Sequence, residues 1–165
     1  MKVRDVMRTV VAFSGLDTDL AAAVELMCKN ACGFLPVVGE GGNVVGVITD
    51  RDICIALGTR NQKPTEVLVR DVMLPEQYTF PKLFTCAPDD DIHCVLKTMR
   101  KERIRRLPVI DREGTLVGIL SMVDIVLQAC AKAEKHEISC EDVVDAYKAI
   151  CIHEGPPTRR RPKVA

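Results

Sequence analysis

The chain has 165 residues, of which 47% are hydrophobic and 28% are charged, and Lys plus Arg balance Asp plus Glu at 23 each. This composition is typical of a soluble globular protein, and the balanced charge excludes a global field that would recruit nucleic acid or an anionic membrane. No run approaches the roughly 18 apolar residues that a spanning helix needs, and the N-terminus lacks the apolar segment of a secretion signal, so we expect a cytoplasmic protein.

The first predicted elements follow the pentapeptide Val-Arg-Asp-Val-Met at residues 3–7. Residues 9–13 are a short segment rich in residues that favour β-strands, which predicts a strand. Asp17 or Thr18 then caps a predicted helix, because a polar side chain there can accept hydrogen bonds from the first free N–H groups. We expect one buried face on this helix, made of Leu20, Val24, Met27, Cys28 and Ala31.

Two apolar runs of strand length come next, at residues 34–38 and 44–48. They are separated by Gly39-Glu40-Gly41-Gly42-Asn43, which predicts a β-hairpin. A second helix is expected from about Asp50 to Leu57, ending at Gly58.

The second half of the chain repeats the first. Val-Arg-Asp-Val-Met returns at residues 69–73, 66 residues later, whereas Leu35-Pro36-Val37 and Val45-Gly46-Val47 have counterparts 72 residues later. The six added residues fit best within residues 74–80. Each of the two similar units would have about 60–70 residues, which is too few to form a good hydrophobic core alone. We therefore expect the units to pack against each other.

The second unit is expected to contain the same elements as the first: a strand at residues 82–86, a helix capped by Asp89 or Asp90, and a final helix from Met122 into Ala133. Two further strands, at 106–110 and 115–120, flank the turn 111–114, and the helix after the cap should bury Ile92, Val95, Leu96 and Met99. Both units have the element order strand, helix, strand, strand, helix. This repeated order predicts an α/β (α+β) domain with pseudo-twofold symmetry. The predicted units are residues 1–66 and 67–133.

The remaining sequence predicts a helical extension over residues 134–153 and a disordered basic tail over 154–165. Ser139, followed by Glu141 and Asp142, should open the helix, which is interpreted as a lid or a dimer contact. Arg159-Arg160-Arg161-Pro162-Lys163 favours a solvated terminus over a nucleic-acid arm. The apolar side of the helix is expected to consist of Val143, Val144, Tyr147 and Ile150.

The eight cysteines include no C-x-x-C pair, and the three histidines do not gather around them. The pattern therefore favours free thiols that pack as small hydrophobic groups, and it predicts no metal site.

The candidate binding residues lie where an apolar strand gives way to a helix, at Thr49-Asp50-Arg51-Asp52 and Ser121-Met122-Val123-Asp124. A hydroxyl followed three residues later by an acid is close to a capping box, which satisfies the free N–H groups of a helix start. The alternative is a ligand site. A carboxylate in this position can accept both hydroxyls of a cis-diol such as ribose, and the hydroxyl and N–H groups suit a phosphate.

The same three motifs occur in the same order in both copies: Leu-Pro-Val, Val-Gly-Val/Ile and Thr/Ser-x-x-Asp. This pattern resembles a tandem pair of CBS domains over residues 1–133. The resemblance implies two βαββα-type repeats that form one module with two clefts, a homodimer, and a role in regulating a separate, unknown protein. It also implies an adenosine-type ligand, expected to be AMP, ADP or ATP and otherwise NAD(H) or S-adenosylmethionine, with no required cofactor.

Carried over residue by residue, the resemblance makes each cleft a composite of both repeats. Asp124 would hold ribose, with phosphate near Ser121, Arg105 and Arg106, and the adenine would contact Ala12, Cys32 and Gly33. Asp52 would act with Thr49 and Arg51, and the base pocket would be lined by Phe84 and Ile104, although Phe84 could equally fill this pocket as a core residue.

The two clefts are not expected to be equivalent. Arg105-Arg106 stands before Leu-Pro-Val in the second repeat, where the first repeat has Gly33-Phe34. We therefore expect the Asp124 cleft to bind the more highly charged nucleotide, or to bind more tightly. Arg105 and Arg106 could instead form a solvated basic edge.

Three other functions compete with an adenine-nucleotide sensor. An enzyme acting on nucleotides is disfavoured because the sequence has no P-loop, paired nucleophile or metal-binding carboxylate cluster. A ligand-free structural dimerisation module is the main alternative. Nucleic-acid binding through the basic tail is a weaker one.

Overall fold

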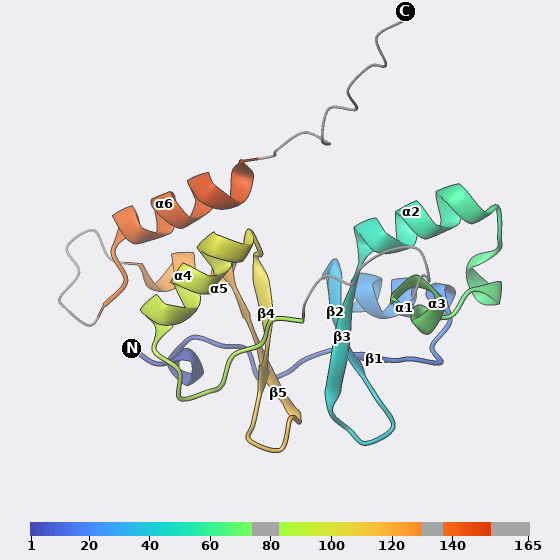
Figure 1. Cartoon of the computed structure of the whole chain (residues 1–165), viewed down its shortest axis with the longest axis horizontal. Helices are drawn as coiled ribbons and strands as arrows, with labels where there is room; N and C mark the ends of the chain where they lie inside the picture. The colour runs from blue at the N-terminus through green and yellow to red at the C-terminus, as the bar shows by residue number, and fades with distance from the viewer. Residues whose placement is uncertain (74–82, 130–136, 153–165) are drawn as a thin grey trace, which may run out of the picture.

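The computed structural model of the chain describes residues 1–73, 83–129 and 137–152. Two β-hairpins stand side by side in the centre, and helices cover their outer sides (Figure 1). We call the elements that surround the first hairpin the first half and those that surround the second hairpin the second half. The elements of the first half are β1 (Ser14–Gly15), α1 (Leu20–Lys29), β2 (Phe34–Val38), β3 (Val44–Thr49), α2 (Asp50–Arg60), the 3-10 turn η2 (Pro64–Glu66) and α3 (Val69–Met73).

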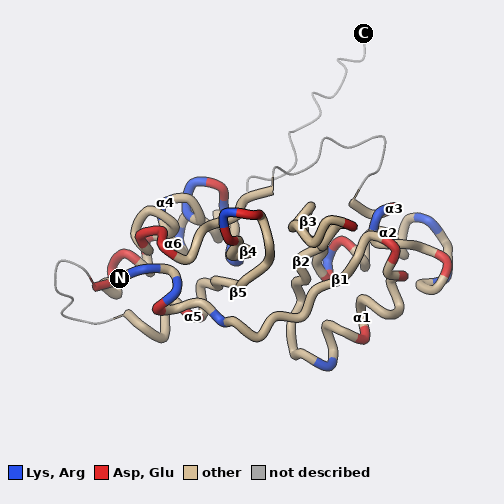
Figure 2. Tube along the Cα trace, turned by 90° about the horizontal axis from the view of Figure 1, so that it is seen from below, with Lys and Arg blue, Asp and Glu red and all other residues tan. Residues whose placement is uncertain are grey.

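The second half repeats this plan around its own hairpin. Among the described helices, none is long and apolar enough to cross a membrane. Charged residues are found mainly on the helices and turns of both halves, and few belong to the central strands (Figure 2). The elements are the 3-10 turn η1 (Val3–Asp5), α4 (Ile92–Glu102), β4 (Arg106–Ile110), β5 (Leu116–Ser121), α5 (Met122–Gln128) and α6 (Cys140–Cys151).

The strand registers confirm the internal duplication. β2 and β3 are antiparallel, with Phe34 opposite Thr49 and an irregularity between Val37 and Val38. β4 and β5 have the same pairing 72 residues later, with Arg106 opposite Ser121. The two predicted hairpins are therefore confirmed, with strand limits within a residue of those expected.

The two Val-Arg-Asp-Val-Met segments are exchanged between the halves. Lys2 forms a β-bridge with Asp91 of the second half, whereas Leu68 forms the equivalent bridge with Asp19 of the first. Val3 is buried in the second-half core, and Val69 is buried in the first-half core. Each segment therefore completes the hydrophobic core of the repeat to which it does not belong in sequence.

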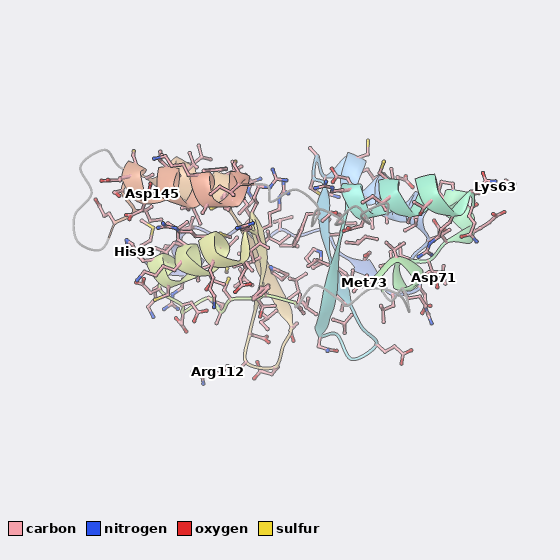
Figure 3. All side chains as sticks on the ribbon, turned by 45° about the horizontal axis from the view of Figure 1, so that its top comes forward. Lys63, Asp71, Met73, His93, Arg112 and Asp145 are labelled. Atoms are coloured by element: carbon pink, nitrogen blue, oxygen red, sulfur yellow. The ribbon has the colours of Figure 1, made fainter. Side chains whose placement is uncertain are left out.

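A glycine in each hairpin makes room for the methionine of the exchanged segment. A Cβ on Gly46 would overlap Cε of Met73, and a Cβ on Gly118 would lie 2.9 Å from Sδ of Met7. Met73 lies beside β3 in the side-chain view (Figure 3). Val-Gly-Val/Ile is thus part of the packing that holds the exchanged segments.

The predicted strand at residues 9–13 is wrong. The structure has only the two-residue β1, which runs parallel to β2 and starts at Ser14. Val10 is 95% exposed and Phe13 is 54% exposed, so high β-propensity here is not matched by a pairing partner or by burial. In the second half, residues 83–85 are likewise outside any strand and only Cys86 forms a bridge; residue 82 lies outside the described residues.

α1 begins later than expected and buries a narrower face. Its N-cap is Asp19, which accepts from N of Ala22, whereas Oγ1 of Thr18 accepts from N of Gly15. Val24 is 45% exposed. Cys28 and Ala31 are also exposed, and Ala31 lies beyond the helix end, so the predicted buried stripe is wrong at three positions. The buried residues are Leu20, Ala23 and Met27.

α2 does not end at Gly58, as its sequence suggested, but continues to Arg60 and ends at Asn61, which has a left-handed φ of 51°. A Cβ on Gly58 would meet nothing within 4 Å, so this glycine satisfies no steric need and the helix passes through it.

α4 buries the predicted face, but its N-cap is Asp91 rather than Asp89 or Asp90. α5 ends at Gln128, short of Ala133, and residues 130–133 lie outside the described residues. The buried residues of α4 are Ile92, Val95, Leu96 and Met99.

α6 begins after its predicted N-cap Ser139, and its buried residues belong to the second-half core, where α6 packs against α4 and α5. It is therefore a structural part of the second half, and its interpretation as a lid or a dimer contact stays a prediction. Val144, predicted on its apolar side, is 49% exposed. The predicted basic tail lies outside the described residues. The core residues supplied by this region are Ile138, Val143, Ala146 and Ile150.

Candidate functional site

Asp52 is held at the start of α2 by the last residue of β3. Oδ2 of Asp52 accepts hydrogen bonds from N of Thr49 at 2.9 Å and from its Oγ1 at 2.6 Å. N of Asp52 donates back to Oγ1 of Thr49 at 3.2 Å. This is the reciprocal capping box, and it leaves the other carboxylate oxygen, Oδ1, turned away from the cap.

Asp124 has the same cap and one further partner. Its Oδ2 accepts from N and Oγ of Ser121, at 3.1 and 2.5 Å. Its Oδ1 accepts from Nε of Arg8 at 2.7 Å. The Asp124 side chain is 7% exposed, whereas that of Arg8 is 67% exposed. A carboxylate this deeply buried needs a compensating charge, and Arg8 supplies it.

A third hydroxyl-x-x-Asp motif lies outside the two repeats and forms the same helix cap. On α6, Oδ2 of Asp142 accepts from N of Ser139 at 3.3 Å and from its Oγ at 2.7 Å. The hydrogen bond from the Ser139 hydroxyl holds the pKa of Asp142 below its usual value. Hydroxyl-x-x-Asp geometry is therefore a helix cap in all three places, and only its surroundings can make it a ligand site.

The backbone of Arg105 and Arg106 lies next to the Asp124 motif. Arg106 is paired with Ser121 across the β4–β5 ladder, so both side chains leave the same face of the hairpin. N of Met122 donates to the carbonyl oxygen of Arg105 at 2.9 Å. The cations and the carboxylate are thus on adjacent parts of one repeat.

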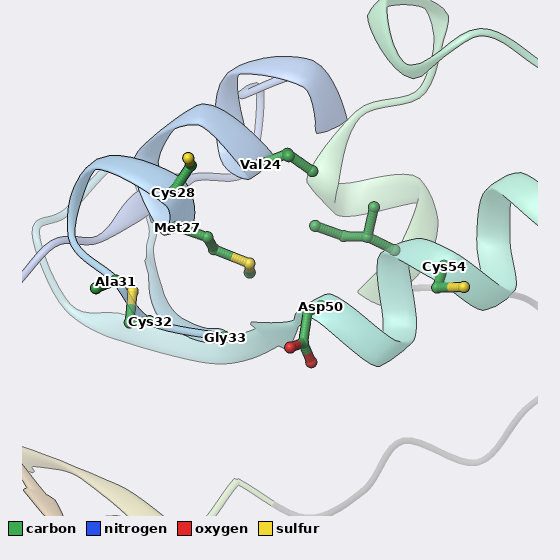
Figure 4. A pocket seen from close by; sticks show the side chains of 9 residues that line it. Val24, Met27, Cys28, Ala31, Cys32, Gly33, Asp50 and Cys54 are labelled. Carbon is green, nitrogen blue, oxygen red and sulfur yellow. The ribbon is translucent and has the colours of Figure 1, made fainter.

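Gly33 lies beside the cap of its own repeat. N of Asp50 donates to the carbonyl oxygen of Gly33 at 3.3 Å, and a Cβ on Gly33 would collide with the Asp50 carboxylate. Cys32 and Gly33 line a pocket of about 490 Å³ between α1 and α2 (Figure 4). Asp50 lies on this pocket, but neither Asp52 nor Asp124 does.

The other predicted adenine contacts are packed against hydrophobic cores. Ala12 packs on the first-half core, and Phe84 and Ile104 pack on the second-half core. Arg51, predicted to support phosphate, is exposed, and its N donates to Oδ1 of Asp50 at 2.7 Å. A role of these four residues at a ligand stays a prediction.

Two other kinds of site, a metal site and a reactive thiol at Cys86, find no support in the described residues. In the described ranges, no group of three or more His, Cys, Asp or Glu side chains is placed to hold a metal ion. Cys86 is buried, and this burial raises the pKa of its thiol to about 12. The thiol is therefore protonated and unreactive near neutral pH.

The duplicated architecture and its two capped aspartates correspond to a known family, because the sequence model of the CBS domain matches residues 3–59 and 69–129. The chain belongs to the CBS domain family. Its structure is similar to that of the CBS domain pair of protein MJ0100 in complex with 5'-methylthioadenosine and S-adenosyl-L-methionine, with 27% identity, a TM-score of 0.65, and coverage of 77% of this chain and 98% of that one.

Two longer proteins are also similar in sequence. An uncharacterized protein of Methanopyrus kandleri is 32% identical over 119 residues, which are 72% of this chain and 57% of that protein. A homoserine O-acetyltransferase of Methanococcoides burtonii is 33% identical over 123 residues, 74% of this chain and 23% of the enzyme. The chain thus spans less than two thirds of either relative, and its likeness to the enzyme concerns only the part that the CBS pair covers.

Arg8 is the contact that sequence reasoning missed. It is 116 positions from Asp124 in sequence, and no local motif connects the two. The one available signal is the 66-residue offset, which aligns Arg8 with the uncharged Leu74 in the second copy.

Proposed function

We propose that this CBS pair binds adenosine-type ligands and regulates a separate protein in response to them. The observation that carries the proposal is the pair of capped carboxylates, Asp52 and Asp124, one in each repeat of a CBS module. The similarity to a CBS pair whose complex contains two adenosine derivatives supports it.

At Asp52, both hydroxyls of a ribose cis-diol could donate to Oδ1, because Oδ2 is already used by Thr49. The neighbouring Arg51 would then support a phosphate. A charged ligand of this kind gains charge-assisted hydrogen bonds, which are stronger than neutral ones.

At Asp124, the phosphate would be supported by Arg105 and Arg106, whose backbone lies beside Ser121. We propose AMP, ADP or ATP as ligands, with NAD(H) and S-adenosylmethionine as the alternatives. The larger number of cations in this repeat supports the prediction that its cleft takes the more highly charged nucleotide.

We also propose a homodimer. Exposed apolar side chains on α1 and α2 support it, since Val24 is 45% exposed and Ile55 is 55% exposed. Val24 lines the pocket between these helices together with the exposed Cys28 and Cys54. A structural dimerisation module without ligand is the second candidate function, because the caps alone explain both Thr/Ser-x-x-Asp motifs.

A calorimetric and thermal-shift panel of AMP, ADP, ATP, NADH and S-adenosylmethionine tests the proposal. A ligand present at 100 times its dissociation constant should stabilise the fold by about 2.7 kcal/mol. If no member of the panel binds, the ligand-free dimerisation module is the better description. Phosphate release from ATP, followed in the same samples, would reveal an enzyme instead.

A further inference from the structure

Arg8 fills an acceptor position on Asp124 that has no counterpart at Asp52. Nε of Arg8 donates to Oδ1 of Asp124 at 2.7 Å. Within the described parts of the chain, no hydrogen bond or ion pair is found at Oδ1 of Asp52. By the 66-residue offset, the second copy has Leu74 where the first has Arg8. The two carboxylates therefore differ in how much of their hydrogen-bonding capacity is already used.

The backbone of Arg8 is fixed beside the Asp124 motif. N of Arg8 donates to O of Ile119, and N of Ile119 donates to O of Arg8, both at 2.9 Å. The approach is close enough that a Cβ on Gly118 would lie 2.9 Å from O of Arg8. Because the backbone is anchored and the side chain is 67% exposed, the guanidinium can rotate away without uncovering the core.

Arg8 reduces the number of acceptor positions that Asp124 can offer to the hydroxyls of a ribose. A carboxylate offers about four lone-pair positions, two on each oxygen. The hydroxyl and backbone N of Ser121 use both positions on Oδ2 of Asp124, and Arg8 uses one on Oδ1. One position remains for the two hydroxyls of a cis-diol, whereas Oδ1 of Asp52 keeps two.

A diol can therefore bind Asp124 through both hydroxyls only if the guanidinium leaves. A neutral nucleoside offers Arg8 nothing in exchange for the lost charge-assisted hydrogen bond. A phosphorylated one offers an anion, to which a guanidinium donates in a favourable bidentate geometry. Arg106, on the same face as Ser121, adds a second cation close by.

We propose that Arg8 is a specificity-determining residue, which makes the Asp124 cleft select phosphorylated adenosine ligands over neutral ones by moving from the carboxylate to the ligand phosphate. This inference rests on the proposed function, because it presupposes that adenosine compounds bind. The Asp52 cleft lacks this selection and accepts neutral ligands.

The test uses AMP and adenosine, which differ only in the phosphate. Asp52→Asn confines ribose binding to the Asp124 cleft and keeps an acceptor for the α2 cap. In this background, calorimetry measures both dissociation constants with and without Arg8→Gln. We expect Arg8→Gln to strengthen adenosine binding and to lower the preference for AMP over adenosine about tenfold or more.

Arg4→Gln is the matched control, since Arg4 lies on the same segment and pairs with the exposed Asp89. It should leave the preference unchanged. Stronger adenosine binding by Arg8→Gln cannot result from misfolding. If Arg8→Gln binds both ligands with the unchanged preference, the role of Arg8 is refuted while the proposed function stands. If neither ligand binds the otherwise unmodified protein, the proposed function fails and the inference fails with it.

Discussion

Asp52 and Asp142 are held in the same way: Oδ2 of each accepts hydrogen bonds from the N and the hydroxyl of the residue three positions earlier. One lies in a CBS repeat and the other on α6, which packs against α4. The pair therefore separates the structural role of the motif from its proposed role in binding.

Asp52→Ala and Asp142→Ala should each lower the free energy of unfolding by about 1 kcal/mol, because each removes capping hydrogen bonds. Only Asp52→Ala should also weaken AMP binding at its cleft, by a factor of about 10–150, since it removes a charge-assisted hydrogen bond to the ribose. Chemical denaturation and calorimetry measure the two effects. Equal AMP affinity in both variants would leave Asp52 with the cap alone.

Gly118→Ala should be more destabilising than Gly46→Ala. At Gly118 the new methyl group would lie 2.9 Å from the carbonyl oxygen of Arg8, which is backbone held by two hydrogen bonds. At Gly46 it would meet only the end of the flexible Met73 side chain. We expect a loss of about 1–3 kcal/mol for Gly118→Ala and less for Gly46→Ala, measured by urea denaturation. The reverse order would show that the Arg8 backbone is not firmly anchored.

Cys86 should be the least reactive of the described cysteines. Burial raises the pKa of its thiol to about 12, so almost no thiolate is present at pH 8. Timed alkylation with iodoacetamide, followed by peptide mass spectrometry, should modify the exposed Cys28 and Cys54 first. Equal rates at all three would mean that the second-half core opens readily.

The same shift predicts a loss of stability in alkali. Because the pKa of Cys86 is higher in the folded chain than its ordinary value of 9.0, its contribution to stability is complete below about pH 9 and declines as pH rises toward 12. Cys86→Ala has no thiol to ionise, so its stability relative to the unmodified protein should improve between pH 9 and 10.5. Parallel curves over this range would contradict the prediction.

Removal of the α6 cap should weaken the second half at neutral pH, and this loss of stability should become smaller in acid. The Ser139 hydroxyl lowers the pKa of Asp142, so the stabilising contribution is present above the ordinary aspartate pKa of 3.8 and is lost as pH falls through the folded value. Ser139→Ala should cost about 1 kcal/mol at pH 7 and progressively less below pH 4. Thermal melting from pH 3 to 7 gives this comparison, and a pH-independent difference would refute the ionic origin.

The elements that could be predicted are those whose signal is local. Strands β2 and β4 were expected with their observed limits because each is an apolar run next to turn residues. α4 buries its predicted face because its apolar spacing has a single core to meet. The capped positions of Asp52 and Asp124 also follow from short-range spacing, and the structure places both at helix starts.

The features that sequence could not supply depend on distant partners. Val24 and Cys28 continue the helical spacing of Leu20, but α1 has a core on only one narrow side, so they are exposed. Residues 9–13 have strand-forming side chains and no neighbouring strand to pair with. The Arg8–Asp124 pair joins residues that are 116 positions apart, one from each repeat of the sequence, which no local pattern can reveal.

The crossing of the two Val-Arg-Asp-Val-Met segments makes the repeats mutually dependent for folding. A fragment ending before Val69 would lack the side chains that close the first-half core, and a fragment starting after Met7 would leave the second-half core open. Neither copy is thus a free-standing folding unit, and the molecule should melt in one cooperative step. A ligand that stabilises either half would then slow the unfolding of the whole chain. Binding in one half would thus stabilise the other half without any hinge motion.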